Sequence, residues 1–188
     1  MSMMITHGVL ELLGIPRSAC TARVTLGGAE GVFSSHPHRA SLAHPHRVQL
    51  ISFDQMRALV GGRVSAAASI PEAWPAARNS AAIPDLNQAE EEQLRRALFA
   101  HVMGRGGEVA GYQHVLARRF LPLDIIVYTG RDIHIRKGEI LRIEPDGHDP
   151  VIVPFEKVTL EEGGQIRCEA PVVMIVEKFI KVKSATSK

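Results

Sequence analysis

A repeated strand-and-turn pattern between residues 123 and 182 constrains the fold of this chain more than any other feature. The segment Ile133-His134-Ile135-Arg136-Lys137-Gly138 aligns with Val158-Thr159-Leu160-Glu161-Glu162-Gly163, and matching positions lie about 25 residues apart. β-Branched and apolar residues fill the runs between the turn residues, which is typical of strands separated by tight turns. The pattern therefore predicts that residues 123–183 form a β-rich region.

Two architectures can accommodate this repeat. In an antiparallel β-sandwich or jelly roll, the two copies are similar hairpins with Gly138 and Gly163 at their turns. In a β-solenoid, each copy is one rung that buries its apolar side against the next rung, and about three rungs are usually needed for stability. Because only two imperfect copies are visible, we expect the antiparallel sandwich or jelly roll and keep a short β-solenoid as the alternative.

Residues 1–122 are expected to form an N-terminal α+β region. Alternating apolar residues predict strands within 20–51, with a hairpin around residues 28–30. Residues 63–86 are rich in Ala, Ser and Pro, which predicts an irregular connection. Asn87 and Glu90 have the spacing of a capping box at the start of two helices over 87–120.

The predicted fold class is therefore α+β and mainly β. We expect the helical hairpin 87–120 to pack against the β-rich region 123–183. The N-terminal strands are too few for an independent domain, so we expect them to complete the same cooperative core.

The composition of the chain argues against several classes of function. The chain has 188 residues, of which 45% are hydrophobic and 22% charged, so it is globular. A net charge of +2 is too small for a nucleic-acid partner, and no apolar run approaches the ~18 residues of a membrane span. Cys20 and Cys168 form no CxxC motif, so a reducing, cytoplasmic location fits best.

Four histidines form the one constellation that predicts a site. The motif His-Pro-His-Arg occurs twice, eight residues apart, and supplies His36, His38, His44 and His46. Residues i and i+2 of an extended segment point the same way, so His36 and His38 could share one face and bind one divalent transition metal ion. Two-residue histidine spacing is similar to that of cupin-type barrels, but proline separates each pair here and the expected Glu does not follow. The alternative is a solvent-exposed loop without a functional metal.

Other candidate chemistry is sparse. Asp146-Gly147-His148-Asp149 could hold a metal or do acid–base work, but Asp-Gly is a strong turn signal and we expect a turn. The sequence contains no P-loop, no Gly-x-Gly-x-x-Gly fingerprint and no Gly-x-Ser-x-Gly elbow.

The leading hypothesis is accordingly a non-catalytic assembly or binding protein without a cofactor. It would form a homo-oligomer through strand edges or apolar patches, because edge strands must be covered. A first alternative is a metal-dependent enzyme of cupin-like character that uses the loop from His36 to His46. A second alternative is a small-ligand carrier with a pocket between helices and sheet.

Overall fold

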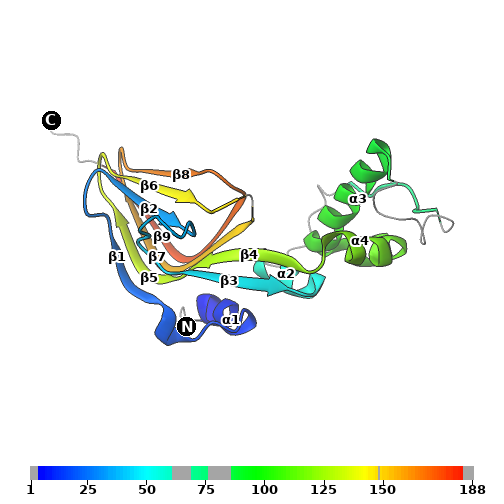
Figure 1. The fold of residues 1–188 in the computed structure, drawn as a ribbon, viewed down its shortest axis with the longest axis horizontal. Coiled ribbons are helices and arrows are strands. Elements are labelled where there is room, and N and C mark those ends of the chain that lie inside the picture. The colour runs from blue at the N-terminus through cyan, green and yellow to red at the C-terminus, as the bar shows by residue number, and fades with distance from the viewer. Residues whose placement is uncertain (1–3, 61–68, 76–85, 148, 184–188) are drawn as a thin grey trace. The chain divides into compact units, whose positions relative to one another are not determined.

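The chain divides into two compact units. The computed structural model describes residues 4–60, 69–75, 86–147 and 149–183 (Figure 1). One unit comprises residues 1–48 and 124–188 and is called the β-unit below, and the other comprises residues 49–123 and is called the helical unit. The fold is α+β with more strand than helix, as the sequence predicts.

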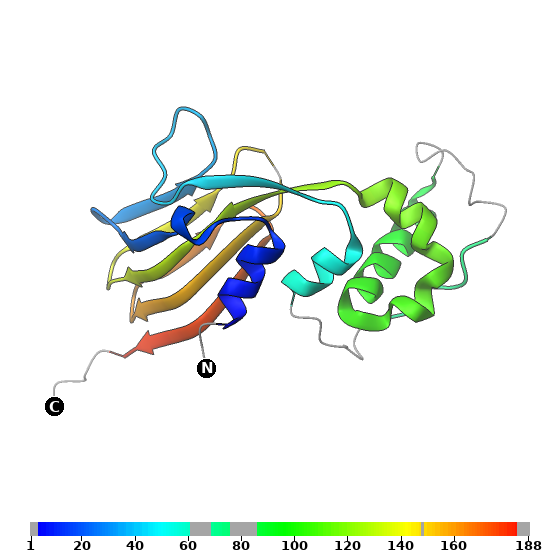
Figure 2. The same cartoon turned by 90° about the horizontal axis from the view of Figure 1, so that it is seen from below.

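Nine strands are present in the described residues. Their bounds are β1 (Thr21–Thr25), β2 (Glu30–Ser34), β3 (Pro45–Leu50), β4 (Leu123–Tyr128), β5 (Gly130–Ile135), β6 (Ile140–Glu144), β7 (Val151–Glu161), β8 (Gln165–Cys168) and β9 (Val172–Val182). The larger sheet has the order β1-β5-β7-β4-β3, with β9 also paired to β7, and the smaller sheet has the order β2-β6-β8. The larger sheet curls around the smaller one (Figures 1 and 2).

The sequence repeat corresponds to stacked parallel strands. Ile133 of β5 lies beside Val158 of β7, and Leu141 of β6 lies beside Ile166 of β8, so both pairs keep the 25-residue offset of the sequence alignment. The pairs β1–β5, β2–β6, β4–β7 and β7–β9 are parallel as well. The antiparallel pairing expected for a sandwich or jelly roll is therefore wrong for these strands.

The predicted N-terminal hairpin is also wrong. β1 pairs with β5 and β2 pairs with β6, so the two strands enter different sheets instead of pairing with each other. The physical reason is that each strand finds a longer-range partner of matching apolar periodicity. Val24 lies beside Ile133, and both side chains are buried in the core of the β-unit.

The core of the β-unit lies between the two sheets. Its centre is a stack of three aromatic rings, in which the Phe33 ring centroid lies 5.2 Å from that of Tyr128 and 5.9 Å from that of Phe155. Gly130 lies beside Phe155 in the strand register and leaves room for that ring. The other buried members are Val24, Leu26, Ala43, Ile126, Ile133, Ile135, Leu141, Ile143, Val151, Val153 and Val158.

A short helix, α1 (Met4–Leu12), packs against β7 and β9 (Figure 2). Thr6 is buried, and its backbone N–H donates to Glu177 Oε1 of β9 at 3.1 Å. Leu10 is 4% exposed, so the helix buries an apolar side. Gly14 follows with φ +66°, the left-handed conformation that commonly ends helices.

The helical unit contains the predicted hairpin. Its elements are α2 (Phe53–Leu59), α3 (Gln88–Ala100), a π-helical turn η4 (His101–Arg105), a 3₁₀ segment η5 (Gly106–Tyr112) and α4 (Gln113–Phe120). The Asn87–Glu90 capping box is confirmed, with both reciprocal hydrogen bonds present. An ion pair of 3.4 Å between Arg119 Nε and Glu91 Oε1 joins α4 to α3.

This unit has its own apolar core, which includes Leu94, Leu116 and Trp74, each at most 7% exposed. The buried side of the hairpin thus packs against α2 and residues 70–74 of the same unit. The expected packing of the hairpin on the β-rich region and the single cooperative core stay predictions. Of the predicted irregular connection, residues 63–68 and 76–85 lie outside the described part of the chain.

Candidate functional site

The four predicted metal ligands lie on and beside one loop of the β-unit. Residues 35–44 connect β2 to β3; His36, His38 and His44 lie in this loop and are exposed, and His46 is half-buried on β3. The ring centroids of His36 and His38 are 5.8 Å apart, and those of His44 and His46 are 5.2 Å apart. The sequence spacing therefore does bring each pair of imidazoles together.

The surroundings of the imidazole rings affect which nitrogens are available to a metal ion. The backbone N–H of His38 donates to His36 Nδ1 at 3.2 Å, which leaves Nε2 of that ring for another partner. Burial lowers the pKa of His46, and the neighbouring His44 lowers it further, so this ring favours its neutral form. A neutral imidazole is the form that coordinates metals.

Structural and catalytic zinc sites use at least three protein ligands. Among residues 4–60, 69–75, 86–147 and 149–183, no group of three or more His, Cys, Asp or Glu side chains is placed to hold a metal ion. The four histidines form two pairs, and metal binding at His36, His38, His44 and His46 stays a prediction.

The same loop covers one end of the β-unit core. Ala43 is 2% exposed and belongs to the core cluster, and Leu42 packs partly buried against it. The backbone N–H of Leu42 donates to the Val32 carbonyl of β2 at 2.9 Å. Ser41 Oγ accepts from the backbone N–H of Ser34 at 3.0 Å. The loop is therefore anchored as a lid over β2, a role that its histidine pattern did not indicate.

Ion pairs continue this anchoring along the smaller sheet. Arg39 of the loop pairs with Glu144, which is 9% exposed at the end of β6. Arg142 bonds Glu144 at 3.4 Å, Glu30 of β2 at 3.3 Å and Glu169 at 3.4 Å. The Arg142 guanidinium thus connects β2, β6 and the segment that follows β8. These ion pairs stabilise the packing of the three segments.

The acidic turn after β6 is structural where it is described. Gly147 has φ +86°, a conformation that favours glycine, and the backbone N–H of Asp146 donates to Ser35 Oγ at 2.8 Å. The turn expected from Asp146-Gly147 is confirmed. His148 lies outside the described residues.

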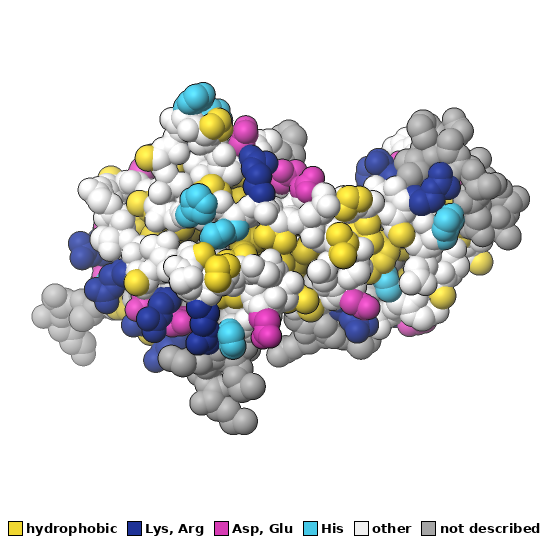
Figure 3. Space-filling model, turned by 60° about the horizontal axis from the view of Figure 1, so that its bottom comes forward, with side chains coloured by type: hydrophobic (Ala, Val, Ile, Leu, Met, Phe, Trp, Pro, Cys, Tyr) yellow, Lys and Arg dark blue, Asp and Glu magenta, His cyan; other side chains and the backbone are white. Residues whose placement is uncertain are grey.

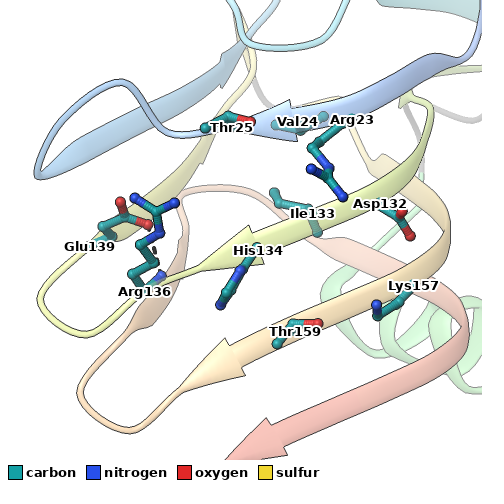
Figure 4. A pocket seen from close by; sticks show the side chains of 10 residues that line it. All are labelled: Arg23, Val24, Thr25, Asp132, Ile133, His134, Arg136, Glu139, Lys157 and Thr159. Atoms are coloured by element: carbon teal, nitrogen blue, oxygen red, sulfur yellow. Dashed lines mark hydrogen bonds between the residues drawn. The ribbon is translucent and has the colours of Figure 1, made fainter.

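A groove of about 160 Å³ crosses the outer surface of β1, β5 and β7 (Figure 4). Arg23, Asp132 and Lys157 lie side by side in the strand register, so charges of opposite sign alternate across it. His134 Nε2 lies 2.8 Å from Glu161 Oε1, and the backbone N–H of Lys137 lowers the pKa of that carboxyl.

Lys and Arg side chains gather over this part of the β-unit in Figure 3, with His and acidic side chains beside them. Drug-sized ligands occupy pockets of roughly 300–1,000 Å³. The volume of this groove is about half the lower limit of that range. The charged side chains that line it are of both signs. The charged side chains of this groove lie opposite one another on neighbouring strands.

The opposite end of the β-unit lacks a comparable lid among the described residues. β9 is paired with β7 along one side only and lies at the sheet edge in Figure 2. Val172, Met174 and Val176 pack only partly buried against the core cluster, and Phe179 is 51% exposed. We call this the open end. The sequence contains a pattern that could have indicated this exposed strand, because five consecutive apolar residues at 172–176 follow the last recognisable repeat.

The two cysteines are free, Cys20 half-buried and Cys168 exposed on β8. β8, which carries Cys168, is the terminal strand of the smaller sheet. In the described residues, no helix has the length and apolarity needed to span a membrane. No protein-family model, curated protein or solved structure matches the chain.

Proposed function

We propose that this chain is a non-catalytic assembly protein that self-associates as a homo-oligomer through the open end of a short β-solenoid. The parallel stacking of β5 on β7 and of β6 on β8 at one 25-residue offset supports a solenoid. In a solenoid each rung buries its apolar side against the next rung. A last rung without a neighbour therefore leaves apolar surface exposed to water.

The observation that carries this proposal is the edge strand β9. Eleven residues, Val172–Val182, pair with β7 on one side, and β9 is a terminal strand of its sheet. An edge strand of this length presents a row of backbone donors and acceptors to any second strand. In natural sheets such edges are covered or paired, and oligomerisation is one way to do so.

The polar features of the β-unit fit this role better than they fit catalysis. Arg142 and His134 contact acidic side chains of neighbouring strands, and Arg23 lies beside Asp132 in the strand register. These contacts run between neighbouring strands, which supports a role in strand pairing. An enzyme would need a set of convergent groups.

The test is the mass of the untagged chain in solution. Size exclusion with light scattering over a hundredfold range of concentration should give a mass above that of one 20.5 kDa chain. A mass of one chain at every concentration would refute the proposal. Elemental analysis of the same fractions tests the metal alternative, which requires about one ion per chain and its loss when His36 and His38 are both changed to alanine.

A further inference from the structure

The two ends of the β-unit differ in how well they are covered. At the β1–β2 end, Val24 is 2% exposed, Leu26 4% and Phe33 0%, and the lid residues Leu42 and Ala43 pack on the same cluster. At the open end, Phe179 is 51% exposed and Val182 42%. Within the described residues of the β-unit, the exposed large apolar side chains therefore lie at the open end.

The charges on β9 divide the strand into two halves. Val172-Val173-Met174-Ile175-Val176 contains no charged residue, whereas the second half carries Glu177, Lys178 and Lys181. Lysines on an edge strand discourage pairing with another strand, because the approaching strand must desolvate or repel them. The neutral half, Val172–Val176, lacks this protection, and among the described residues no second strand pairs with β9 besides β7.

The neutral half is also nearly symmetric about its centre. Val172 and Val176 are identical, and Val173 and Ile175 are both β-branched, so the segment presents the same shapes in either direction around Met174. In an antiparallel pair of two copies centred on Met174, each residue would face an apolar, β-branched or Met side chain. Such cross-strand pairs are the stabilising unit of a sheet.

We propose that Val172–Val176 pairs antiparallel with the same segment of a second copy about a twofold axis near Met174, giving a closed dimer. This inference rests on the proposed function and specifies its partner and stoichiometry. A twofold contact uses the same surface on both copies, so the open ends of both chains are buried in it. Because the lid covers the other end of each core, the assembly stops at two chains.

A parallel, in-register contact is disfavoured by the same charges. It would place Glu177 opposite Glu177 of the second copy and Lys178 opposite Lys178, and like charges directly opposite are destabilising. In the antiparallel arrangement centred on Met174, these residues extend beyond the paired segment and stay in water.

The experiment compares single lysine substitutions on the full-length chain. Val173→Lys and Ile175→Lys each introduce two like charges into a twofold interface, and we expect a rise of at least about tenfold in the dimer dissociation constant, since 1.4 kcal/mol changes Kd tenfold. Ala22→Lys and Thr25→Lys, both at exposed positions of the β1 edge strand, are the matched controls and should leave it unchanged. Far-UV circular dichroism and urea midpoints establish that each variant is folded.

Each outcome decides the inference. Two chains per particle, dissociated by Val173→Lys or Ile175→Lys but not by the controls, would support it. A mass that grows beyond two chains, or a dimer dissociated by Ala22→Lys instead, would overturn it while leaving self-association intact. A monomer at all concentrations would overturn this inference and the proposed function together. If both neutral-half variants are unfolded, Val172→Thr with Val176→Thr gives the same decision, because it lowers the apolarity of the segment without adding charge.

Discussion

The contact between Gly130 and Phe155 offers the sharpest test of the parallel β5–β7 register. A Cβ atom added at Gly130 would lie 2.4 Å from Cε1 and 2.7 Å from Cζ of the Phe155 ring. That ring is 0% exposed and stacks on Phe33 at 5.9 Å, so it has little freedom to move away. Overpacking of this kind costs about 1–3 kcal/mol, which is the destabilisation expected for Gly130→Ala.

A double-mutant cycle isolates the contact. Phe155→Leu removes the two ring atoms that clash and should itself cost about 1–3 kcal/mol, in the range of large-to-small core changes. In that background Gly130→Ala should cost less than about 0.5 kcal/mol, so the two substitutions would be coupled by about 1–2 kcal/mol. Gly28→Ala is the control, because nothing lies within 4 Å of its added Cβ.

The assay is urea unfolding followed by far-UV circular dichroism, which reports strand content. The chain has one tryptophan, Trp74, in the core of the helical unit, so its fluorescence reports on that unit separately. Additive effects of Gly130→Ala and Phe155→Leu would mean that these residues do not face each other, and the 25-residue register would then be refuted.

Three further outcomes are expected. Asn87→Ala removes the helix cap that accepts from Glu90 N at 3.0 Å and should cost about 1 kcal/mol, seen as a lower urea midpoint in Trp74 fluorescence; an unchanged midpoint would contradict the role of the capping box. Leu42→Ala trims the lid over the core and should lower the thermal midpoint of the β-unit, whereas Ala40→Ser on the exposed part of the loop should not. Burial lowers the pKa of His46, so the unfolded chain binds more protons and stability should fall as pH drops through about 6.5. His46→Gln should reduce the loss of thermal midpoint between pH 7.5 and 5.5, and an equal loss in both proteins would contradict this.

Local features of the chain were predictable from sequence because they depend on neighbours along the chain. The capping box at Asn87 and the turns at Gly138 and Gly163 follow from short-range hydrogen bonding and from the conformational freedom of glycine, with φ of +80° and +85° at the two turn glycines. The 25-residue repeat was also visible, because matching rungs need matching apolar positions.

The candidate site was predicted less completely. Spacing alone brought His36 near His38 and His44 near His46, since each pair is separated by one residue. The role of the loop as a lid depends on Leu42 and Ala43. These residues contact β2 and core residues that are not their neighbours in the sequence. No local pattern distinguishes a buried loop leucine from an exposed one.

The amino-acid sequence by itself determined where strands, turns and helix caps lie in this protein, and that the chain carries an unprotected apolar run at 172–176. Only the tertiary structure decided that the strands stack in parallel, that β1 pairs with β5 across the inserted helical unit, and that one end of the core is covered while the other is open. The physical reason is that backbone hydrogen bonds are alike for every strand. Periodicity therefore specifies which face of a strand is buried, whereas the choice of partner depends on how the whole core packs.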